Sequence, residues 1–287
     1  MIGVNSNGGL GNQLFQFAFA YAAARRLKTS FFINDSPRRF CVPRYFELKR
    51  YGAIHNQAQR AFFYLISRGK FDRVHYDNWE APSKNVAAIK NTTLYSGFFQ
   101  SEDYFKDFQD EVRIQFKVQE RYVREFKKKY HHFFENHRII AVHIRRTDFA
   151  VHGDETLGGK NLCLPLPYYR AFLQRINERA DDLVVFLGDD VAFMKENIKA
   201  KSNYVFEHNA GIIDFQILMH ADILCISNSS FAWWAAYLNS KPTKTVFAPE
   251  YWMGFKIMKE HPCGVIVPDW NLLNVSAHGY ANTTSCF

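Results

Sequence analysis

The sequence has few cysteines and no motif that pairs them. Five cysteines are scattered through 287 residues, in an odd total and without a C-x-x-C pair. This pattern argues against a disulfide framework and favours reduced thiols. No run of about 18 apolar residues occurs, so we expect no membrane-spanning helix. The first residues also lack the basic and apolar regions of a signal peptide, and we therefore expect a cytoplasmic protein.

The charge is moderately basic. The formal net charge is +8, which favours an anionic partner such as a nucleotide, a nucleic acid or an acidic membrane surface. The basic residues are dispersed and no nucleic-acid recognition motif is present, so we expect no nucleic-acid partner.

Residues 121–137 have the spacing of an amphipathic helix, with aromatic residues on one face and Lys127, Lys128 and Lys129 on its flank. The simpler interpretation is a helix with one solvated face. The alternative is peripheral contact with an anionic membrane at its inner face, where this basic helix would dock.

The second half of the chain alternates apolar, β-branched segments with helical segments. Strands are expected at residues 139–144, 183–187, 204–206, 223–226 and 245–248, with a further candidate at 265–267. Strands that alternate with helices predict a doubly wound parallel sheet with right-handed crossovers.

The first half begins with a β-α-β unit. A short strand at residues 1–4 precedes a glycine-rich turn, a helix from about residue 12 to 28 follows, and residues 30–33 form the next strand. Residues 36–110 are aromatic, basic and irregular, and their elements cannot be ordered from sequence. We place the domain boundary near residue 137, which gives domains of residues 1–137 and 138–287.

The first candidate site segment is Gly8-Gly-Leu-Gly-Asn-Gln13. Its spacing is not that of the dinucleotide fingerprint G-x-G-x-x-G. Glycines such as Gly11 still let backbone N–H groups approach an anion at a helix N-terminus. Asn12 can cap the helix and Gln13 can point at a ligand, but a tight turn with an ordinary Asn cap explains the segment equally well.

The second candidate segment follows the strand at residues 139–144. Arg145 and Arg146 come where a buried strand ends, and two guanidinium groups there suit a phosphate or a carboxylate. His143 and Asp148 add a titratable ring and a carboxylate. The alternative is an ion-paired strand end without a ligand.

Three further positions lie at turns of the predicted sheet. Asp189 and Asp190 follow a strand, and we assign them to donor binding, although the simple interpretation is a helix cap with an acidic first turn. The segment around Asn228, Ser229 and Ser230 places hydroxyls and an amide at a strand-to-helix turn, where they can donate to phosphate oxygens. Asp214 can cap its helix or accept two donors from a guanine edge, and spacing does not decide between the two.

Together these motifs resemble the α1,2-fucosyltransferase family. The resemblance rests on Gly-Gly-Leu-Gly-Asn-Gln-Leu-Phe-Gln-Phe at residues 8–17, His-Ile-Arg-Arg-Thr-Asp at 143–148, and Ser-Asn-Ser-Ser-Phe-Ala-Trp-Trp-Ala-Ala-Tyr-Leu at 227–238. It implies an α/β, GT-B-like fold of two Rossmann-like domains that face a central cleft. It also implies a glycosyltransferase that moves L-fucose from GDP-β-L-fucose to O2 of a terminal β-galactoside with inversion, in glycan or O-antigen biosynthesis, without a metal or other cofactor.

The resemblance also implies roles for single residues. Arg145 and Arg146 would hold the diphosphate, with Ser229 and Ser230 on phosphate and His143 and Asp214 near guanine. Residues 11–13 would close on the donor from the N-terminal, acceptor-side domain, and residues 138–287 would form the GDP-fucose-binding domain.

Paired arginines and a helix N-terminus also suit the chemistry itself. Negative charge grows on the leaving diphosphate in the transition state, and donors already aimed there stabilise that charge. Inversion also needs a general base for the acceptor hydroxyl. The base of related enzymes falls near residue 153, which is Gly153 here, so we assign Glu155 instead; Asp148 is better suited to orient an arginine.

Two other functions fit parts of the sequence. A non-catalytic GDP-sugar or glycan-binding module would share the fold, since fold does not fix function. An oxidoreductase is disfavoured because the glycine spacing is wrong and Phe31 and Phe32 stand about 20 residues on, where an acidic ribose-binding residue is expected.

Overall fold

The computed structural model describes residues 1–36, 39–49 and 51–275 of the chain. Cys286 therefore lies outside the described residues, and none of the other four cysteines forms a disulfide with another described residue. The chain divides into two compact units. The N-terminal unit comprises Met1–Glu120 with Pro262–Val265, and the C-terminal unit comprises Arg121–His261 with Ile266–Phe287.

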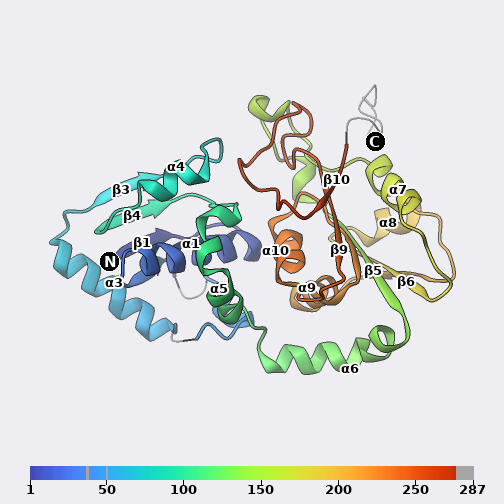
Figure 1. The fold of residues 1–287 in the computed structure, drawn as a ribbon, viewed down its shortest axis with the longest axis horizontal. Helices are drawn as coiled ribbons and strands as arrows, with labels where there is room; N and C mark the ends of the chain where they lie inside the picture. Colours follow the sequence, from blue (N-terminus) through green and yellow to red (C-terminus); the bar gives the residue numbers. More distant parts are fainter. Residues whose placement is uncertain (37–38, 50, 276–287) are drawn as a thin grey trace. The chain divides into compact units, whose positions relative to one another are not determined.

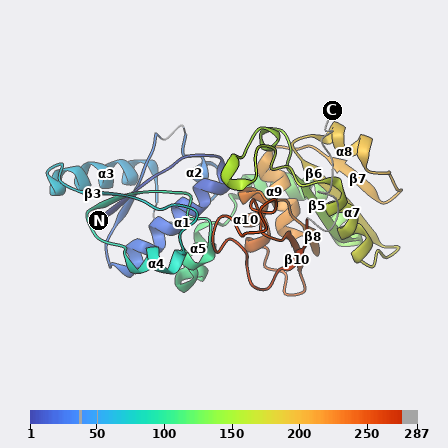
Figure 2. The ribbon, with the colours of Figure 1, turned by 90° about the horizontal axis from the view of Figure 1, so that it is seen from above.

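The N-terminal unit is a four-stranded parallel sheet with helices on both faces. Its strands run in the order β2-β1-β4-β3. Figure 2 shows α3 on one face of this sheet and α1, α4 and α5 on the other. The elements are β1 (Ile2–Asn5), α1 (Leu10–Arg26), β2 (Phe31–Asn34), α2 (Val42–Tyr45), α3 (Ala53–Ser67), β3 (Asp72–His75), α4 (Pro82–Ala87), β4 (Thr93–Ser96), the 3₁₀ turns η1 (Glu102–Tyr104) and η2 (Lys106–Phe108), and α5 (Gln109–Gln115).

Helix α1 is buried nearly all round, as its apolar sequence predicts. Phe17 and Phe19 are fully buried, and the ring of Phe19 stacks on that of Phe99 with centroids 3.9 Å apart. The helix begins at Leu10 with Gly9 as its N-cap residue. The expectation that Asn12 caps this helix is therefore wrong, because the helix starts before it.

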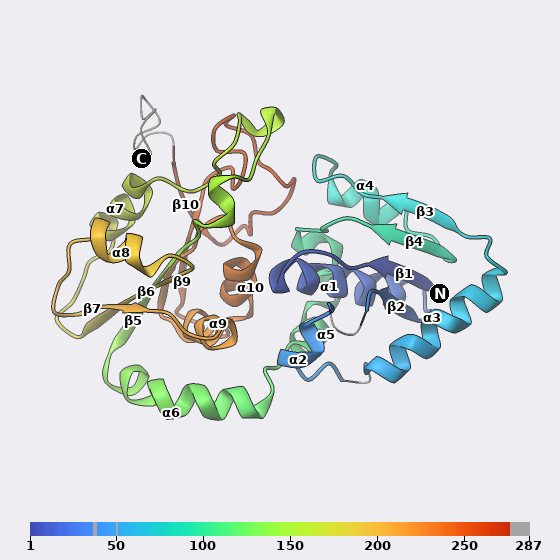
Figure 3. The same cartoon turned by 180° about the vertical axis from the view of Figure 1, so that it is seen from behind.

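The C-terminal unit contains a six-stranded parallel sheet, in the order β10-β9-β8-β5-β6-β7. Figure 3 shows α7 and α8 on one face of this sheet and α9 and α10 on the other. The elements are α6 (Glu120–Asn136), β5 (Arg138–Ile144), the 3₁₀ turns η3 (Asp148–Ala150) and η4 (Glu155–Leu157), α7 (Leu166–Arg175), β6 (Asp182–Gly188), α8 (Val191–Asn197), β7 (Tyr204–Glu207), α9 (Gly211–His220), β8 (Ile223–Cys225), α10 (Ser230–Leu238), β9 (Thr245–Pro249) and β10 (Asn271–Leu273).

The doubly wound parallel sheet predicted from the alternating pattern is confirmed. The candidate strand at residues 265–267 is not formed, and Asn271–Leu273 pairs with β9 instead. Trp233 and Trp234 on α10 are fully buried, which confirms that they belong to the core.

Helix α6 belongs to the C-terminal unit, so the units divide earlier than the boundary expected near residue 137. Its aromatic face packs on that unit: the rings of Phe126 and His220 lie 5.4 Å apart, and the Tyr130 hydroxyl donates to Glu207 at 2.7 Å. Figure 1 shows the helix beneath α9. The simpler interpretation of this helix, with one packed and one solvated face, is confirmed.

Candidate active site

The strand order of the C-terminal sheet reverses between β5 and β8. From β5 the chain steps outward to β6 and β7, then returns to the other side of β5 and continues through β8, β9 and β10. This is the strand order of dinucleotide-binding folds, in which ligands bind beyond the carboxyl ends of the strands where the order reverses. His143 lies in β5, and the other predicted site residues of this unit follow β5, β6 or β8 or lie on the helix that leads into β8.

The side chains of His143 and Ser227 are in contact near this reversal of the strand order. Nδ1 of His143 and Oγ of Ser227 lie 2.8 Å apart, and the His143 residue is only 5% exposed. Burial, reinforced by the charge of Arg145, lowers the pKa of His143 to about 4. The imidazole is therefore neutral at physiological pH and does not act as a cation toward a phosphate. Ser227 is the first residue of the serine motif, and its spacing from His143 in the sequence does not predict this contact.

Arg145 is held by carboxylates. Its Nε lies 2.8 Å from Oδ1 of Asp148, and its Nη2 donates to Oδ2 of the same carboxylate at 2.9 Å. Oδ2 of Asp189 lies 3.4 Å from the same Nε. This two-point contact agrees with the expectation that Asp148 orients an arginine.

The Arg146 guanidinium packs against an aromatic ring, and its N–H groups make no hydrogen bonds to the described residues. Its Cζ lies 3.4 Å from the centroid of the Phe193 ring, and its Nε lies 3.6 Å from a carboxylate oxygen of Asp190. Within residues 1–36, 39–49 and 51–275, its guanidinium donates no hydrogen bond. A planar cation with free N–H groups is suited to an incoming phosphate. Sequence reasoning missed Phe193, which only the packing of α8 places under Arg146.

Asp189 and Asp190 hold the loop and the helix that surround the arginines. Asp189 accepts from the backbone N–H of Arg146 at 2.9 Å and from the Thr147 hydroxyl at 2.5 Å. Asp190 caps α8 by accepting from the backbone N–H of Phe193 at 3.0 Å, as the simple interpretation predicts. Direct contact of either carboxylate with a donor substrate stays a prediction.

The ends of β5 and β6 approach each other closely at Gly188. A Cβ at this position would lie 2.1 Å from the carbonyl oxygen of Ile144. Only glycine fits there without displacing backbone, so Gly188 fixes the distance between the arginine loop and the aspartate turn.

The serine turn opens α10. Ser229 is its N-cap residue, and the Ser229 hydroxyl makes no hydrogen bond within the described part of the chain. The Asn228 residue is 1% exposed; its Nδ2 donates to the carbonyl of Leu162 at 2.9 Å, while its Oδ1 has no partner among the described residues. With the unpaired N–H groups of the helix start, this turn offers donors to an anion.

Asp214 lies inside α9, whose N-cap residue is Ala210, so the expectation that Asp214 caps the helix is wrong. Its carboxylate accepts from Nδ2 of Asn209 at 2.8 Å. Burial raises the pKa of Asp214 to about 6. Asn209 in turn accepts from the hydroxyl of Tyr130 at 3.0 Å, which links Asp214 to α6. Contact of Asp214 with guanine stays a prediction.

The loop after the arginines carries the proposed base. Glu155 is exposed in the short 3₁₀ turn η4. Gly153 has φ +106°, and a Cβ there would lie 2.6 Å from the carbonyl oxygen of Gly159. This backbone leaves no room for a carboxylate side chain at residue 153, and Glu155 as general base stays a prediction.

In the N-terminal unit, the glycine-rich segment is tied to its own surroundings. Gly11 is buried in α1, and Asn12 accepts from Nε2 of Gln100 at 2.7 Å. Gln13 donates to the carbonyls of Gly8 and Arg39 at 3.0 Å, and its Oε1 accepts from the backbone N–H of Cys41 at 2.8 Å. The Gln13 amide therefore holds the chain around residue 40 rather than pointing outward. Closure of residues 11–13 on a donor stays a prediction.

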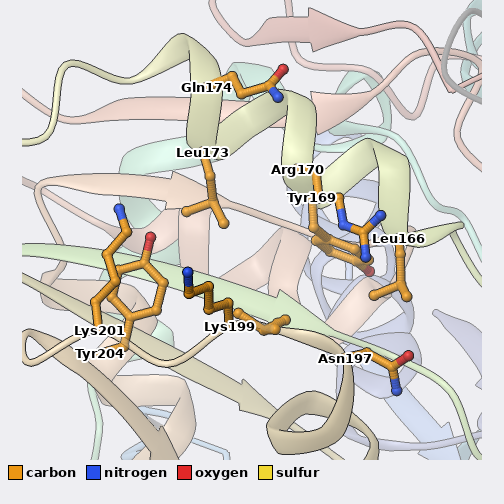
Figure 4. Close-up of a pocket in the computed structure, with 10 residues that line it drawn as sticks. Leu166, Tyr169, Arg170, Leu173, Gln174, Asn197, Lys199, Lys201 and Tyr204 are labelled. Carbon is orange, nitrogen blue, oxygen red and sulfur yellow. The ribbon is translucent and has the colours of Figure 1, made fainter.

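A separate hollow of about 350 Å³ lies elsewhere in the C-terminal unit. It is formed by α7 and the segment that leads into β7, with Leu166, Leu173 and Tyr204 among its lining residues (Figure 4). It holds none of the predicted site residues.

Within the part of the chain that the structure describes, no three His, Cys, Asp or Glu side chains gather as a metal site, and no helix is long and apolar enough to cross a membrane.

Curated relatives cover most of the chain. An O-antigen biosynthesis glycosyltransferase WbnK of Escherichia coli is 25% identical, with 86% of this chain and 93% of the relative covered. An alpha-1,2-colitosyltransferase of the same species is 29% identical, with 85% and 90% covered. Galactoside alpha-(1,2)-fucosyltransferase 2 of Mus musculus is 24% identical, with 93% and 76% covered.

Solved structures share the fold. NodZ, a fucosyltransferase from Bradyrhizobium, was solved as an α1,6-fucosyltransferase soaked with GDP-fucose. It matches with a TM-score of 0.54 at 15% identity, with 83% of this chain and 92% of that chain covered. FUT1 of Arabidopsis thaliana, solved in complex with GDP, matches with a TM-score of 0.53 at 11% identity, with 86% and 70% covered. The α/β, GT-B-like fold with two Rossmann-like units is confirmed.

The family follows from the sequence as a whole. The model of glycosyl transferase family 11 matches residues 1–274, which include the glycine segment, the arginine pair and the serine turn. The resemblance drawn from those three motifs is therefore confirmed, and the chain belongs to glycosyl transferase family 11.

Proposed function

We propose that the chain is a galactoside α1,2-fucosyltransferase, which moves L-fucose from GDP-β-L-fucose to O2 of a terminal β-galactose with inversion. The observation that carries the proposal is the Arg146 guanidinium at the carboxyl edge of the sheet: its Cζ lies 3.4 Å from the Phe193 ring centroid, and it donates no hydrogen bond to the described residues. The curated relatives include α1,2-transferases of fucose and of colitose, which supports the linkage.

In the proposal, hydrogen-bond donors that the fold holds at the carboxyl edge of the C-terminal sheet stabilise the leaving diphosphate. Arg146 and the start of α10 follow β5 and β8, on either side of the reversal point. Both groups can stabilise the negative charge that develops on the diphosphate, and neither has to reorganise as the reaction proceeds. Asp189 holds the backbone of Arg146 in place, so the positive charge is fixed before the donor arrives. This arrangement supports a reaction without a metal, which remains part of the proposal.

The acceptor hydroxyl must lose a proton as its oxygen attacks the anomeric carbon. In the proposal, Glu155 accepts that proton. Its exposed position in η4 leaves the carboxylate accessible to a bound sugar. Glu155→Gln should then lower turnover by about 10²-fold or more with GDP binding unchanged. Equal turnover of this variant would remove Glu155 from the mechanism.

A second donor sugar deserves a direct test because one relative is named a colitosyltransferase. The diphosphate and guanine contacts proposed above are common to any GDP-sugar, so they do not choose between fucose and colitose. Incubation with GDP-fucose and GDP-colitose in competition, with lactose as acceptor, measures the preference. NMR of the product then gives the linkage and the anomeric configuration.

The test of the proposal is formation of an α1,2-fucosylated galactoside from GDP-β-L-fucose. Exclusive transfer of another sugar would show that the proposed donor is wrong. An α-linkage to another hydroxyl would show that the proposed acceptor position is wrong. Binding of GDP-fucose without transfer to any galactoside would instead favour a GDP-sugar-binding module. Participation in O-antigen biosynthesis is the cellular role that the curated relative WbnK suggests.

A further inference from the structure

Helix α3 in the N-terminal unit has an apolar face that nothing in the described chain covers. Four large apolar side chains on it are exposed: Ile54 by 88%, Leu65 by 73%, Phe62 by 51% and Ile66 by 48%. Their spacing, with exposed alanines at residues 58 and 61 between them, places them along one side of the helix. Exposed apolar stripes of this kind mark interaction surfaces.

The opposite face of α3 is the one that holds the helix to its own unit. Phe63 is fully buried against Phe32 of β2, with ring centroids 5.0 Å apart. Nδ2 of Asn56 donates to the carbonyl of Ile33 at 2.9 Å, and Oδ1 of Asn56 accepts from the backbone N–H of Ile33 at 2.7 Å. The helix is thus apolar on its packed side and on its free side, so core packing does not explain the free side.

The charged residues in and next to α3 are mainly basic. The helix itself contains no acidic residue, and residues 49–73 contain six Lys or Arg and a single acidic residue, Asp72. Arg68 and Lys70 are exposed directly after the helix ends, and Arg73 is exposed on β3. An apolar stripe beside cationic side chains is the pattern of a helix that lies in the surface of an anionic bilayer.

We propose that the apolar face of α3 docks this chain on an anionic lipid bilayer, with the helix parallel to the membrane surface. Phe62 and Leu65 enter the boundary of the acyl chains, and the basic residues after the helix contact the lipid phosphates. A second copy of the chain is a poorer occupant. A twofold contact through the same face would bring the two cationic flanks together without acidic residues on the helix to pair them.

Helix α6, the basic helix that the sequence offers for membrane contact, presents no free apolar face in the described part of the chain. Phe126 and Tyr130, the centre of its aromatic stripe, are buried against the C-terminal unit. Lys127, Lys128 and Lys129 are exposed, so α6 offers charge alone. Helix α3 is the element that offers both charge and apolar surface.

Flotation of the whole chain with lipid vesicles tests the proposal. Phosphatidylglycerol vesicles at low salt should carry the protein, and phosphatidylcholine vesicles should carry much less. Phe62→Ser with Leu65→Ser should lower binding by roughly tenfold for each side chain removed. Met258→Ser with Leu272→Ser is the matched control, because both are exposed apolar residues outside α3, and it should float like wild type.

Charge variants give an independent measurement. Arg68→Glu and Lys70→Glu should each weaken binding by about fivefold, with a loss that shrinks as salt rises. Equal thermal unfolding and GDP release with a soluble acceptor show that the variants are folded. Absence of flotation with anionic vesicles, or unchanged flotation of the Phe62 and Leu65 variant, would overturn the proposal. Light scattering that shows a dimer lost in that variant, without flotation, would assign the face to a second copy.

Discussion

Nδ1 of His143 lies 2.8 Å from the hydroxyl oxygen of Ser227, and this buried contact joins the ends of β5 and β8 at the reversal point of the C-terminal sheet. The arginine pair follows one strand and the serine turn follows the other. The contact therefore sets the spacing of the two groups that we assign to the diphosphate.

Ser227→Ala should destabilise the protein. It leaves a buried ring nitrogen of His143 without its partner, which costs about 1–3 kcal/mol in the free energy of unfolding. Urea unfolding measures this loss. Ser229→Ala is the matched control because the Ser229 hydroxyl has no hydrogen-bond partner in the described residues. It should leave stability within about 0.5 kcal/mol while lowering turnover. Equal stability of Ser227→Ala and wild type would remove the contact from the account.

Phe193→Leu should lower turnover while every charge of the site remains. The ring under the Arg146 guanidinium fixes its plane, and loss of a cation–π contact of this kind costs about 0.5–2 kcal/mol. Steady-state kinetics should show the fall in kcat/KM, roughly threefold to thirtyfold. Phe149→Leu is the comparison, since Arg145 is only 5.8 Å from the Phe149 centroid and is held mainly by Asp148. A larger effect from Phe149→Leu would contradict the proposal, which rests on Arg146 and its contact with Phe193.

Gly188→Ala should strongly destabilise the sheet, because the new Cβ would lie 2.1 Å from the carbonyl oxygen of Ile144. Overpacking against backbone costs about 1–3 kcal/mol or more. Gly211→Ala is the control: its Cβ would meet only Phe231, at 3.9 Å. Thermal unfolding compares the two, and the control should be neutral or slightly stabilised. Equal melting temperatures would show that the strand ends can separate freely.

Asp214→Asn should change how stability depends on pH. The raised pKa of Asp214, about 6, means that the folded protein keeps this proton where the unfolded chain loses it, so Asp214 lowers stability as pH rises from about 4 to 6. The lowered pKa of His143, about 4, acts in the opposite direction and removes stability as pH falls from 6.5 to 4.

In wild type these two effects partly cancel, and the variant removes only the first. The unfolding free energy of Asp214→Asn should therefore fall more steeply than that of wild type between pH 6.5 and 4, by up to about 2 kcal/mol. Urea titrations at several pH values measure both curves. Parallel curves would show that Asp214 does not hold a proton in the folded state.

The sequence predicts the C-terminal sheet well because its strands are short apolar runs separated by helices. The turn residues after β5, β6 and β8 could be grouped for the same reason, since carboxyl ends of parallel strands meet at one edge. The side chains that contact the predicted site residues could not be predicted from the sequence. Phe193 under Arg146 and Asn209 beside Asp214 depend on how α8 packs and on the loop before α9, which no periodicity records.

The N-terminal unit was harder to predict. Strand β3 is largely exposed and carries Asp72, Arg73 and His75, so it shows little of the apolar pattern by which strands are recognised. Helix α3 is apolar on two faces, and the sequence alone does not say which face is packed. The structure separates them, and the free face is the basis of the proposed membrane contact.

The most direct test of the central claim is GDP release from GDP-β-L-fucose in the presence of lactose and EDTA, for wild type, Arg146→Ala and Arg170→Ala. Arg170 lines the separate hollow of the C-terminal unit and serves as the control for loss of one positive charge. We expect acceptor-dependent release in wild type, a loss of about 10²–10³-fold in Arg146→Ala, and wild-type release in Arg170→Ala. Equal release by Arg146→Ala and wild type would contradict the assignment of the diphosphate to the carboxyl edge of the sheet.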